Sequence, residues 1–292
     1  MYFALTPKPI RNGNVSTLEL RDAYQMEEYA TYKESFGYRV ERVQDTNIFK
    51  RLGETDIEFP NNPLHEIFHN PANARVHILN DIQYSGGLVN NWKGERRDGT
   101  SAKVDLSPDD LWARLKKQHR NAIRQAEAKN CTIRIGDGHG DFEKFYGMHK
   151  RLSEIKHFTP MQHDNMLELS KTSIVSIYFA MVKDREAATA FILKSPSVWR
   201  FGWGAGIPEF YSYRPSNLLH WQIIQDAKKT GALWYDLGGA GPKNIFKMGF
   251  GAVRGPFQYL DYPKNRKRIF MRNRYVAYGL RHAWKLYTSL KQ

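Results

Sequence analysis

The 292-residue chain has a formal net charge of +14, with 41% hydrophobic and 13% aromatic residues and a single cysteine. This apolar content is enough to form a hydrophobic core and excludes a wholly disordered chain. Cys131 alone can form neither an internal disulfide nor a cysteine-rich zinc site, which favours the reducing cytoplasm. No uncharged run reaches the length of a membrane-spanning helix, and the N-terminus does not have the pattern of a signal peptide.

The first hundred residues carry the weaker structural patterns. They predict a helix over residues 20–36 and short strands over 38–43 and 75–79, with a Pro- and Asn-rich stretch between the strands. A polar turn is expected at residues 96–100, and we interpret it as the seam between two halves of the chain.

Within the first half, residues 65–69 read His-Glu-Ile-Phe-His and match the H-E-x-x-H pattern of zinc peptidases. That pattern needs a firm helix, but Pro63 and Pro71 leave room for barely two turns. A third ligand is also needed, and Glu95 is the one plausible carboxylate between the motif and the seam. We therefore interpret the match as a chance occurrence and expect no metal site.

Beyond the seam the patterns become clearer. Ser107, followed by a proline and two aspartates, predicts a helix with Ser107 as its N-cap that runs to about residue 129. On this helix Arg120 and Arg124 lie one turn apart and share a polar face.

The remaining patterns alternate between strand and helix. The expected elements are a strand at 131–135, a helix at 141–154, strands at 175–182, 187–194 and 198–204, a helix at 216–230, and strands at 233–237 and 257–261. This order predicts an α/β or α+β fold with a mixed, mostly antiparallel sheet flanked by helices.

The strongest local signal is Tyr-Asp-Leu-Gly-Gly at residues 235–239, followed by Phe-Lys-Met-Gly-Phe-Gly at 246–251. A strand that runs into paired glycines brings its backbone close to another segment or to a ligand. Lys243 and Lys247 bracket a short stretch here, and a cation in such a loop can stabilise a developing oxyanion or a phosphate. Spacing alone favours the other reading, a structural bulge and turn with a surface lysine.

The C-terminal segment, residues 264–292, contains nine Lys and Arg residues and no Asp or Glu. Aromatic residues are interleaved with these cations, and a helix is expected from Asn273 onward. Such a segment suits an anionic partner, for example tRNA, a nucleotide-linked lipid or an acidic membrane face. The alternative is a terminal helix with a solvated basic face.

Four segments resemble the Fem family of peptidyltransferases (FemABX), whose members are built from GNAT-like domains. In chain order these are residues 111–129, 208–227, 235–239 and 246–251. The resemblance covers about residues 104–263 and implies a catalytic GNAT-like domain there. It also implies a degenerate GNAT-like domain over residues 1–103. The charge pattern described above makes residues 264–292 a basic helical extension.

The resemblance implies transfer of an amino acid from aminoacyl-tRNA to an amine of a nucleotide- or lipid-linked precursor. The precursor would serve the cell envelope, as in peptidoglycan, or a natural product. Phe246 and Lys247 match the family's FK motif, which supports the transferred carbonyl. Asp236 matches the aspartate of the DLGG motif, and Arg120 and Arg124 match a helix motif that is partly structural and partly phosphate-facing.

The residues at the start of the helix expected at 216–230 indicate which kind of acyl donor the enzyme uses. Coenzyme-A acetyltransferases hold pyrophosphate there on backbone N–H groups of a glycine-rich loop. Here the stretch begins at Arg214, Pro215 lacks an N–H, and Asn217 replaces the first glycine. We therefore favour aminoacyl-tRNA as co-substrate and expect no cofactor. Arg214, Asn217 and Lys243 are expected to bind substrate, and Tyr211 and Tyr213 are candidate donors near the cleft.

Two other functions remain open at this point. The same fold could serve an N-acyltransferase that uses acyl-CoA or an acyl carrier and modifies a sugar or amine in polysaccharide biosynthesis. A non-catalytic nucleic-acid-binding protein could use the same basic tail. For either enzyme we expect a cytoplasmic location, with peripheral contact to an anionic membrane through residues 264–292.

Overall fold

The computed structural model describes residues 26–43, 46–51, 54–58, 75–81, 95–241 and 244–262. Its strands are β1 (Arg39–Val43), β2 (Thr46–Arg51), β3 (Glu54–Glu58), β4 (Arg75–Asp81), β5 (Glu95–Asp105), β6 (Thr132–Ile135), β7 (Val175–Val182), β8 (Arg185–Lys194), β9 (Val198–Gly206), β10 (Trp234–Gly239) and β11 (Val253–Tyr262). Its helices are α1 (Glu27–Ser35), α4 (Leu111–Arg114), α5 (Lys117–Ala128), α6 (Gly138–Lys156), α7 (His163–Ser170), α8 (Pro215–Lys229), α9 (Ile245–Met248) and the 3₁₀ helix η2 (Pro208–Tyr213).

The described strands form one sheet in the order β1-β2-β3-β4-β11-β5-β10-β9-β8-β7-β6. Two neighbouring pairs, β3 with β4 and β9 with β10, are parallel. The other pairs are antiparallel. The sheet is therefore mixed and mostly antiparallel, as the sequence predicts.

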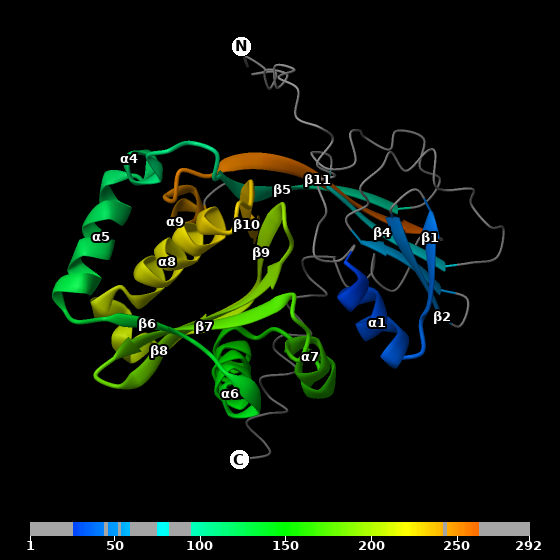
Figure 1. The fold of residues 1–292 in the computed structure, drawn as a ribbon, viewed down its shortest axis with the longest axis horizontal. Coiled ribbons are helices and arrows are strands. Elements are labelled where there is room, and N and C mark those ends of the chain that lie inside the picture. The colour runs from blue at the N-terminus through cyan, green and yellow to red at the C-terminus, as the bar shows by residue number, and fades with distance from the viewer. Residues whose placement is uncertain are drawn as a thin grey trace, which may run out of the picture.

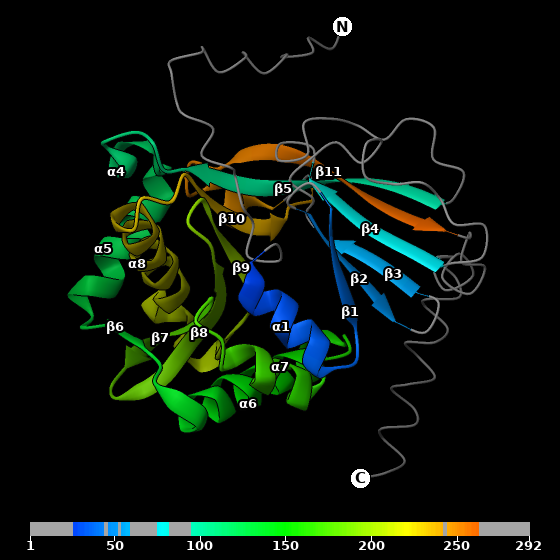
Figure 2. The ribbon, with the colours of Figure 1, turned by 45° about the vertical axis from the view of Figure 1, so that its right-hand side comes forward.

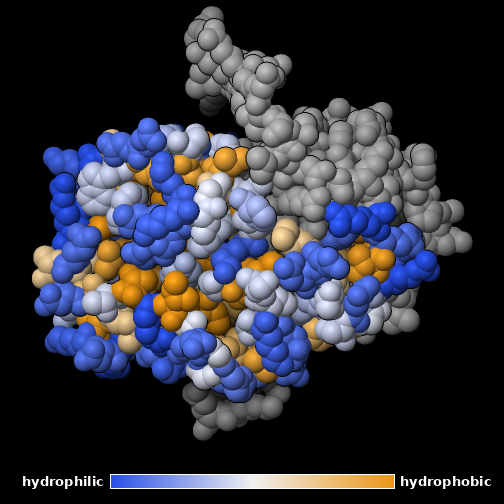
Figure 3. All heavy atoms as spheres, in the orientation of Figure 1, coloured by the Kyte–Doolittle hydropathy of each residue, from blue (hydrophilic) through white to orange (hydrophobic). Residues whose placement is uncertain are grey.

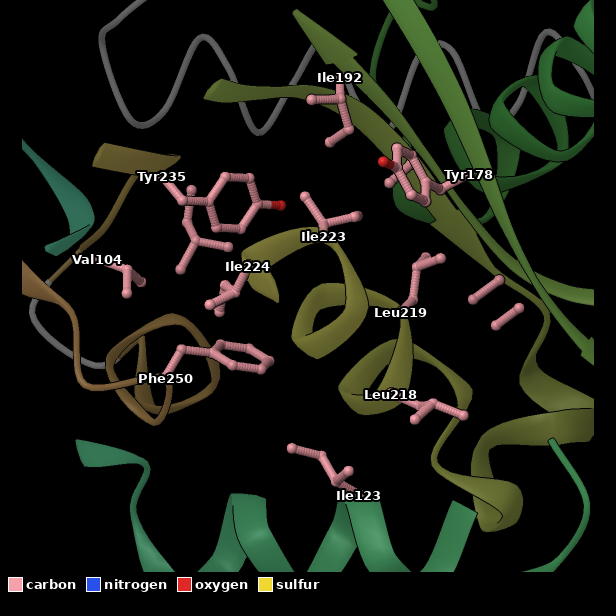
Figure 4. Packing of buried hydrophobic residues seen from close by; sticks show 14 of the residues in the cluster. Val104, Ile123, Tyr178, Ile192, Leu218, Leu219, Ile223, Ile224, Tyr235 and Phe250 are labelled. Carbon is pink, nitrogen blue, oxygen red and sulfur yellow. The ribbon is translucent and has the colours of Figure 1, made fainter. Parts of the chain in front are cut away.

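Helices cover both faces of the β6–β9 part of the sheet (Figures 1 and 2). Because side chains alternate along a strand, Tyr178 of β7 faces the core under α5 and α8, whereas Phe179 faces the core under α6 and α7. In Figure 4, Tyr235 and Phe250 point toward α8, which contributes Leu219, Ile223 and Ile224 to the same core.

Strands β5 and β11 are neighbours near the middle of the sheet, and β5 occupies the residues where the sequence predicts a turn. The prediction of a turn at residues 96–100 is therefore wrong. Residues 96–100 lie inside β5, where Gly99 pairs with Phe257 of β11 and Arg96 pairs with Asp98 through an ion pair of 2.9 Å. The strand can hold these polar residues because the side chains of Arg96 and Asp98 are exposed to solvent. The ladder to β11 provides hydrogen-bond partners for the backbone N–H and C=O groups. The division at residues 103 and 104 stays a prediction, although strand β5 crosses it.

The helix predicted from Ser107 begins later and is interrupted. Ser107 donates its hydroxyl to Asp105 over 2.7 Å, and Asp110 is the N-cap of α4, accepting from the N–H of Ala113 over 2.9 Å. The chain is extended at Leu115 and Lys116 before α5 begins. A tertiary contact explains this break, since the N–H of Lys116 donates to the Gly249 carbonyl over 2.9 Å.

The other expected elements are present with shifted ends. Strands β2 and β3 and helix α7 were not predicted, and the N-terminal helix begins at Glu27 in the described part of the chain. The His65–His69 motif, Lys243 and the segment 264–292 lie outside the described residues. No helix among the described residues combines the length and apolar character needed to cross a membrane.

Candidate active site at the fork between β9 and β10

The two parallel strands β9 and β10 separate after a short ladder. Their pairing runs from Trp234 and Val198 to Asp236 and Arg200 and goes no further. Beyond it, β9 pairs with β8, whereas Gly239 of β10 pairs with Ser101 of β5. We call the diverging ends of the strands beyond Arg200 and Asp236 the fork.

A buried ion pair marks the apex of the fork. Nη1 of Arg200 lies 2.5 Å from Oδ2 of Asp236, and the two side chains are 7% and 0% exposed. The other carboxylate oxygen accepts from the N–H of Gly238 over 2.6 Å. Gly238 has φ 75°, a conformation that glycine adopts without strain. Asp236 therefore holds the turn that leads out of β10, and Arg200, which the sequence analysis missed, holds Asp236.

Lys247 lies at the fork on the short helix α9. Asn244 caps this helix by accepting from the N–H of Lys247 over 3.1 Å. The Lys247 ammonium donates to the carbonyl of Gly239 over 2.8 Å. Burial lowers the pKa of Lys247, and the charge of Asp236 opposes that shift. The loop lysine thus has a defined position next to the glycines of β10, while Phe246 beside it is 37% exposed.

Helix α5 fixes the α9 segment from the other side. His119 of α5 lies with Nε2 2.8 Å from the carbonyl of Phe246, and because a carbonyl only accepts, Nε2 carries the proton. Burial lowers the pKa of His119. A Cβ on Gly249 would overlap the His119 ring, so only glycine fits there. Two motifs far apart in the sequence therefore meet at this contact.

A second buried histidine lies behind the lysine. Nδ1 of His220, on α8, lies 2.7 Å from the Tyr235 hydroxyl, and its ring packs against Phe201, Phe246 and Phe250 at centroid distances of 4.9, 5.7 and 5.5 Å. Burial lowers the pKa of His220 to about 3, with a further contribution from the charge of Lys247. The imidazole is therefore neutral at physiological pH. No sequence motif marks His220, so this neighbour of Lys247 was missed.

Both the sequence and the fold of this region are similar to those of known proteins. Residues 113–248 match the family model described as an acetyltransferase (GNAT) domain. This part of the chain is similar to GNAT domains and has a GNAT-like fold. The matched residues run from α4 to α9 and include both strands of the fork. Among curated proteins, none matches the chain in sequence.

Solved structures share the fold of most of the chain. FemX has a TM-score of 0.63 at 13% identity, with 84% of this chain and 93% of FemX covered. The C-terminal domain of a putative lysylphosphatidylglycerol synthetase from Agrobacterium fabrum has a TM-score of 0.56 at 12% identity, with 82% and 88% covered. L-PGS from Bacillus licheniformis has a TM-score of 0.52 at 14% identity, with 78% and 85% covered. The predicted α/β, GNAT-like fold class is confirmed.

Two arginines predicted to bind substrate lie at the corner between α4 and α5. Arg120 donates to the carbonyl of Leu115, and to that of Ala113 over 3.2 Å, which satisfies acceptors at the end of α4. The Arg124 guanidinium lies 5.4 Å from the centre of the Trp112 ring. Both side chains therefore have structural contacts here, and their role in binding stays a prediction.

The other predicted binding residues follow the β9 arm of the fork. Tyr211 donates to the carbonyl of Gly206 over 3.2 Å, and the ring of Tyr213 lies 5.3 Å from the Lys129 ammonium. Arg214 has φ 60° and donates through Nε to Gln125 over 3.3 Å. The structure thus gathers these residues, with Asn217 in the first turn of α8, at the end of η2 and the start of α8.

No metal centre is evident in the described part of the chain. No group of three or more His, Cys, Asp or Glu residues there could hold a metal ion. Cys131 is buried, with Sγ 3.6 Å from the carbonyl of Tyr213, and burial raises the pKa of its thiol. A raised thiol pKa disfavours the thiolate, so Cys131 is suited to packing and not to attack.

Proposed function

We propose that this protein is an aminoacyltransferase. It moves an amino acid from aminoacyl-tRNA to an amine of a nucleotide- or lipid-linked precursor of the cell envelope, of peptidoglycan type, or of a natural product. The observation that carries the proposal is the Lys247 ammonium held on the Gly239 carbonyl at the fork. The structural likeness to FemX, to the domain of a putative lysylphosphatidylglycerol synthetase and to L-PGS supports the same proposal, since the second of these names denotes a lysyl product.

The start of α8 favours an ester donor over coenzyme A. A pyrophosphate would need free backbone N–H groups at this helix start. Pro215 has none, and the N–H of Asn217 already donates to the carbonyl of Arg214 over 3.1 Å. The first turn of α8 is therefore poor in donors, and an aminoacyl ester of tRNA needs no such cradle.

The chemistry needs little beyond positioning and one cation. The acceptor amine attacks the ester carbonyl carbon, and the carbonyl oxygen becomes an oxyanion. The amide bond then forms as the ester C–O bond breaks, and the ribose hydroxyl leaves with the proton that the amine gives up. Lys247 stabilises the oxyanion, because a donor that is already held in place acts most strongly where charge develops. Alignment of amine and ester supplies much of the remaining acceleration.

A basic surface beside the fork suits tRNA. Strongly hydrophilic residues gather over α5 at the left edge of Figure 3. The exposed side chains on α5 and directly before it include those of Lys116, Lys117 and Arg124. The N–H of Lys116 is bonded to Gly249, so this surface adjoins the segment that carries Lys247. Phosphate contacts of this kind position nucleic acid without reading its sequence. The cationic segment 264–292 could add to this surface or hold the enzyme at an anionic membrane.

A second candidate is an N-acyltransferase that uses acyl-CoA or an acyl carrier and acts on a sugar or amine. The family model that matches residues 113–248 describes an acetyltransferase domain, which favours it. The same lysine and fork would serve a thioester as well as an ester, so the donor decides between the two candidates.

Donor use can be measured directly. The protein is incubated with a mixed pool of charged tRNAs and an acceptor-containing extract, with acetyl-CoA in a parallel reaction. We expect one aminoacyl-tRNA to be discharged, only when extract and protein are both present. Release of coenzyme A with every charged tRNA intact would reject the aminoacyl donor in favour of the second candidate.

A further inference from the structure

Strand β10 has a bulge before its last glycine, between the apex of the fork and the carbonyl that holds the lysine. In the ladder with β5, Asp236 pairs with Lys103, and the next pair joins Gly239 to Ser101. Two residues of β10 therefore lie opposite one residue of β5. A bulge of this kind leaves one residue unpaired and bends its strand. The ladder with β5 thus does not by itself fix the direction in which the Gly239 carbonyl points.

The side chain of Asp236 closes this bulge. One carboxylate oxygen accepts from the N–H of Gly238 over 2.6 Å, and the other accepts from Nη1 of Arg200 over 2.5 Å. Arg200 approaches from β9, where it is the register partner of Asp236 in the last pair before the strands separate. Because a charge-assisted hydrogen bond on each oxygen leaves the carboxylate little rotational freedom, Arg200 holds the rotamer of Asp236 and, through it, the conformation of Gly238.

The Gly239 carbonyl connects the bulge to the lysine. It accepts from Nζ of Lys247 over 2.8 Å, and a Cβ on Gly238 would lie 3.8 Å from the same Nζ. The ammonium therefore lies directly beside the bulge. An ammonium has three N–H groups, and the bond to Gly239 uses one of them. The direction of this carbonyl consequently decides where the other N–H groups can meet an oxyanion.

The chain after the bulge has anchors that do not involve Arg200. The N–H of Ala240 donates to the Thr100 carbonyl over 2.7 Å. The Ala240 carbonyl in turn accepts from the Thr100 hydroxyl over 2.7 Å and from Arg254 over 3.0 Å. Loss of the contact between Arg200 and Asp236 should therefore change the bulge and leave the path of the strand end intact.

We propose that Arg200 is a positioning residue for the transfer reaction. By holding Asp236 it fixes the bulge of β10, and the fixed bulge directs the Gly239 carbonyl and the Lys247 ammonium toward the acyl group in the fork. Arg200 acts through these groups and does not touch the substrate, since its side chain is almost completely buried. This inference rests on the proposed function, because the acyl group that Lys247 meets is the one proposed above.

Steady-state transfer by Arg200→Gln tests this role. Parent and variant are compared over a range of concentrations of the charged tRNA that the parent discharges, with a fixed amount of acceptor-containing extract. We expect kcat to fall by about tenfold or more, because a displaced donor is lost in the transition state, while KM for the charged tRNA stays unchanged. Arg134→Gln is the control and should keep both constants, since its ion pairs to Asp141 and Glu186, of 2.8 and 2.9 Å, lie outside the fork.

A second variant disturbs the bulge without removing a buried charge and so guards against misfolding of Arg200→Gln. Gly238 has φ 75°, and in Gly238→Ala the new Cβ makes ordinary contacts but strains this backbone conformation. Gly231, after α8, has φ 84°, and a Cβ there meets nothing within 4 Å, so Gly231→Ala is a control with similar backbone strain. We expect a loss of kcat in Gly238→Ala and none in Gly231→Ala.

The position of Lys247 can also be followed without any donor. In protein labelled with ¹³C at the lysine Cε, the NMR signal of Lys247 is the one that is missing from Lys247→Met. At neutral pH, Arg200→Gln and Gly238→Ala should both shift this signal toward those of exposed lysines. Arg134→Gln and Gly231→Ala should leave it in place.

A parent kcat in Arg200→Gln, or a loss of kcat with an unmoved Lys247 signal, would overturn the positioning role. If Arg200→Gln does not fold, a parent kcat in Gly238→Ala would do the same. The proposed function fails separately. If the parent discharges charged tRNA and both variants match it, the aminoacyltransferase stands and the positioning role falls. If the Lys247 signal moves as expected but the parent discharges no charged tRNA, the bulge positions the lysine and the aminoacyl donor is wrong.

Discussion

At the scale of single residues, the site depends on charged and polar groups that are almost completely buried. Asp236 and Arg200 are paired below the surface, and His220 and His119 lie among phenylalanine rings. Buried groups of this kind are stabilising only with their partners in place, because an unpaired buried charge is costly. Both the Arg200–Asp236 pair and the buried histidines His119 and His220 should therefore have a measurable effect on the free energy of unfolding.

Asp236→Asn should lower the free energy of unfolding by about 3 kcal/mol, because it leaves the Arg200 guanidinium buried without its counter-charge. Urea unfolding followed by circular dichroism measures the change. Arg151→Gln is the control, since its pair with Glu209 is exposed and should contribute less than about 1 kcal/mol. Equal losses in the two variants would show that the apex pair is no more important than a surface pair.

Acid should weaken the fold before the carboxylates titrate. The pKa of His220 is about 3 in the folded chain and near 6.5 when exposed, so below pH 6.5 the unfolded chain binds the extra proton. Stability from this group is complete above pH 6.5 and declines toward pH 3, by about 2 kcal/mol at pH 5. The pKa shifts of His119 and His149 have the same direction.

Urea unfolding between pH 5 and 8 measures this dependence, and His220→Gln, which can still accept from Tyr235, should flatten it. A free energy of unfolding that does not change over this range in the parent chain would contradict the neutral, buried histidine.

At the scale of elements, the α9 segment is held between β10 and α5. Lys247 bonds to Gly239, the Phe246 carbonyl accepts from His119, and the Gly249 carbonyl accepts from Lys116. These contacts hold a helix of four residues, which would not be stable alone. The position of the lysine thus depends on the closeness of α5.

Gly249→Ala should reduce transfer by about tenfold or more, because its Cβ displaces His119 and shifts the carbonyl of Phe246. Initial rates with saturating donor measure this loss. Gly147→Ala, where a Cβ meets nothing within 4 Å in the interior of α6, should leave the rate unchanged and raise stability by about 0.5–1 kcal/mol. Transfer at the parent rate in Gly249→Ala would mean that His119 does not position the segment.

Much of the element order could be predicted, since periodic patterns identified β7, β8, α6 and α8 with small errors at their ends. The errors occur where tertiary contacts override local preference. Ser107 has the residues of a helix cap after it, but Asp105 accepts its hydroxyl. Residues 96–100 read as a turn, but pairing with β11 extends them.

The site could be predicted only in part for a related reason. Phe246, Lys247 and Asp236 stand in short motifs, whereas Arg200, His119 and His220 enter through sheet register and helix packing. No local pattern records which residues lie opposite one another across β9 and β10. A bulge at Gly202 of β9 is likewise a property of pairing with β8.

At the scale of the whole molecule, β5 and β11 connect the two halves through one sheet. The two strands pair with each other, and β11 also pairs with β4 of the first half whereas β5 also pairs with β10 of the second half. Strand β5 itself continues across the predicted boundary at residues 103 and 104. Domains that share continuous strands cannot unfold separately without breaking those ladders. A cavity of about 500 Å³ between α1 and α7 is also lined by residues of both halves.

The chain should therefore unfold in one cooperative transition. Far-ultraviolet and near-ultraviolet circular dichroism in urea should give the same midpoint. Tryptophan fluorescence should share it, because Trp199 and Trp203 lie in β9 and report on the part of the sheet beyond residue 103. Two separate midpoints would instead establish residues 1–103 as an independent domain.

The most direct test of the whole account is single-turnover transfer by Lys247→Met, measured together with tRNA affinity. Loss of the ammonium should lower the transfer rate by about 100-fold, the usual effect of removing one oxyanion donor, while tRNA affinity stays unchanged. Lys229→Met, an exposed lysine of α8, should match the parent in both measurements. Transfer at the parent rate in Lys247→Met, or a parallel loss of rate and affinity, would contradict a catalytic lysine at the fork.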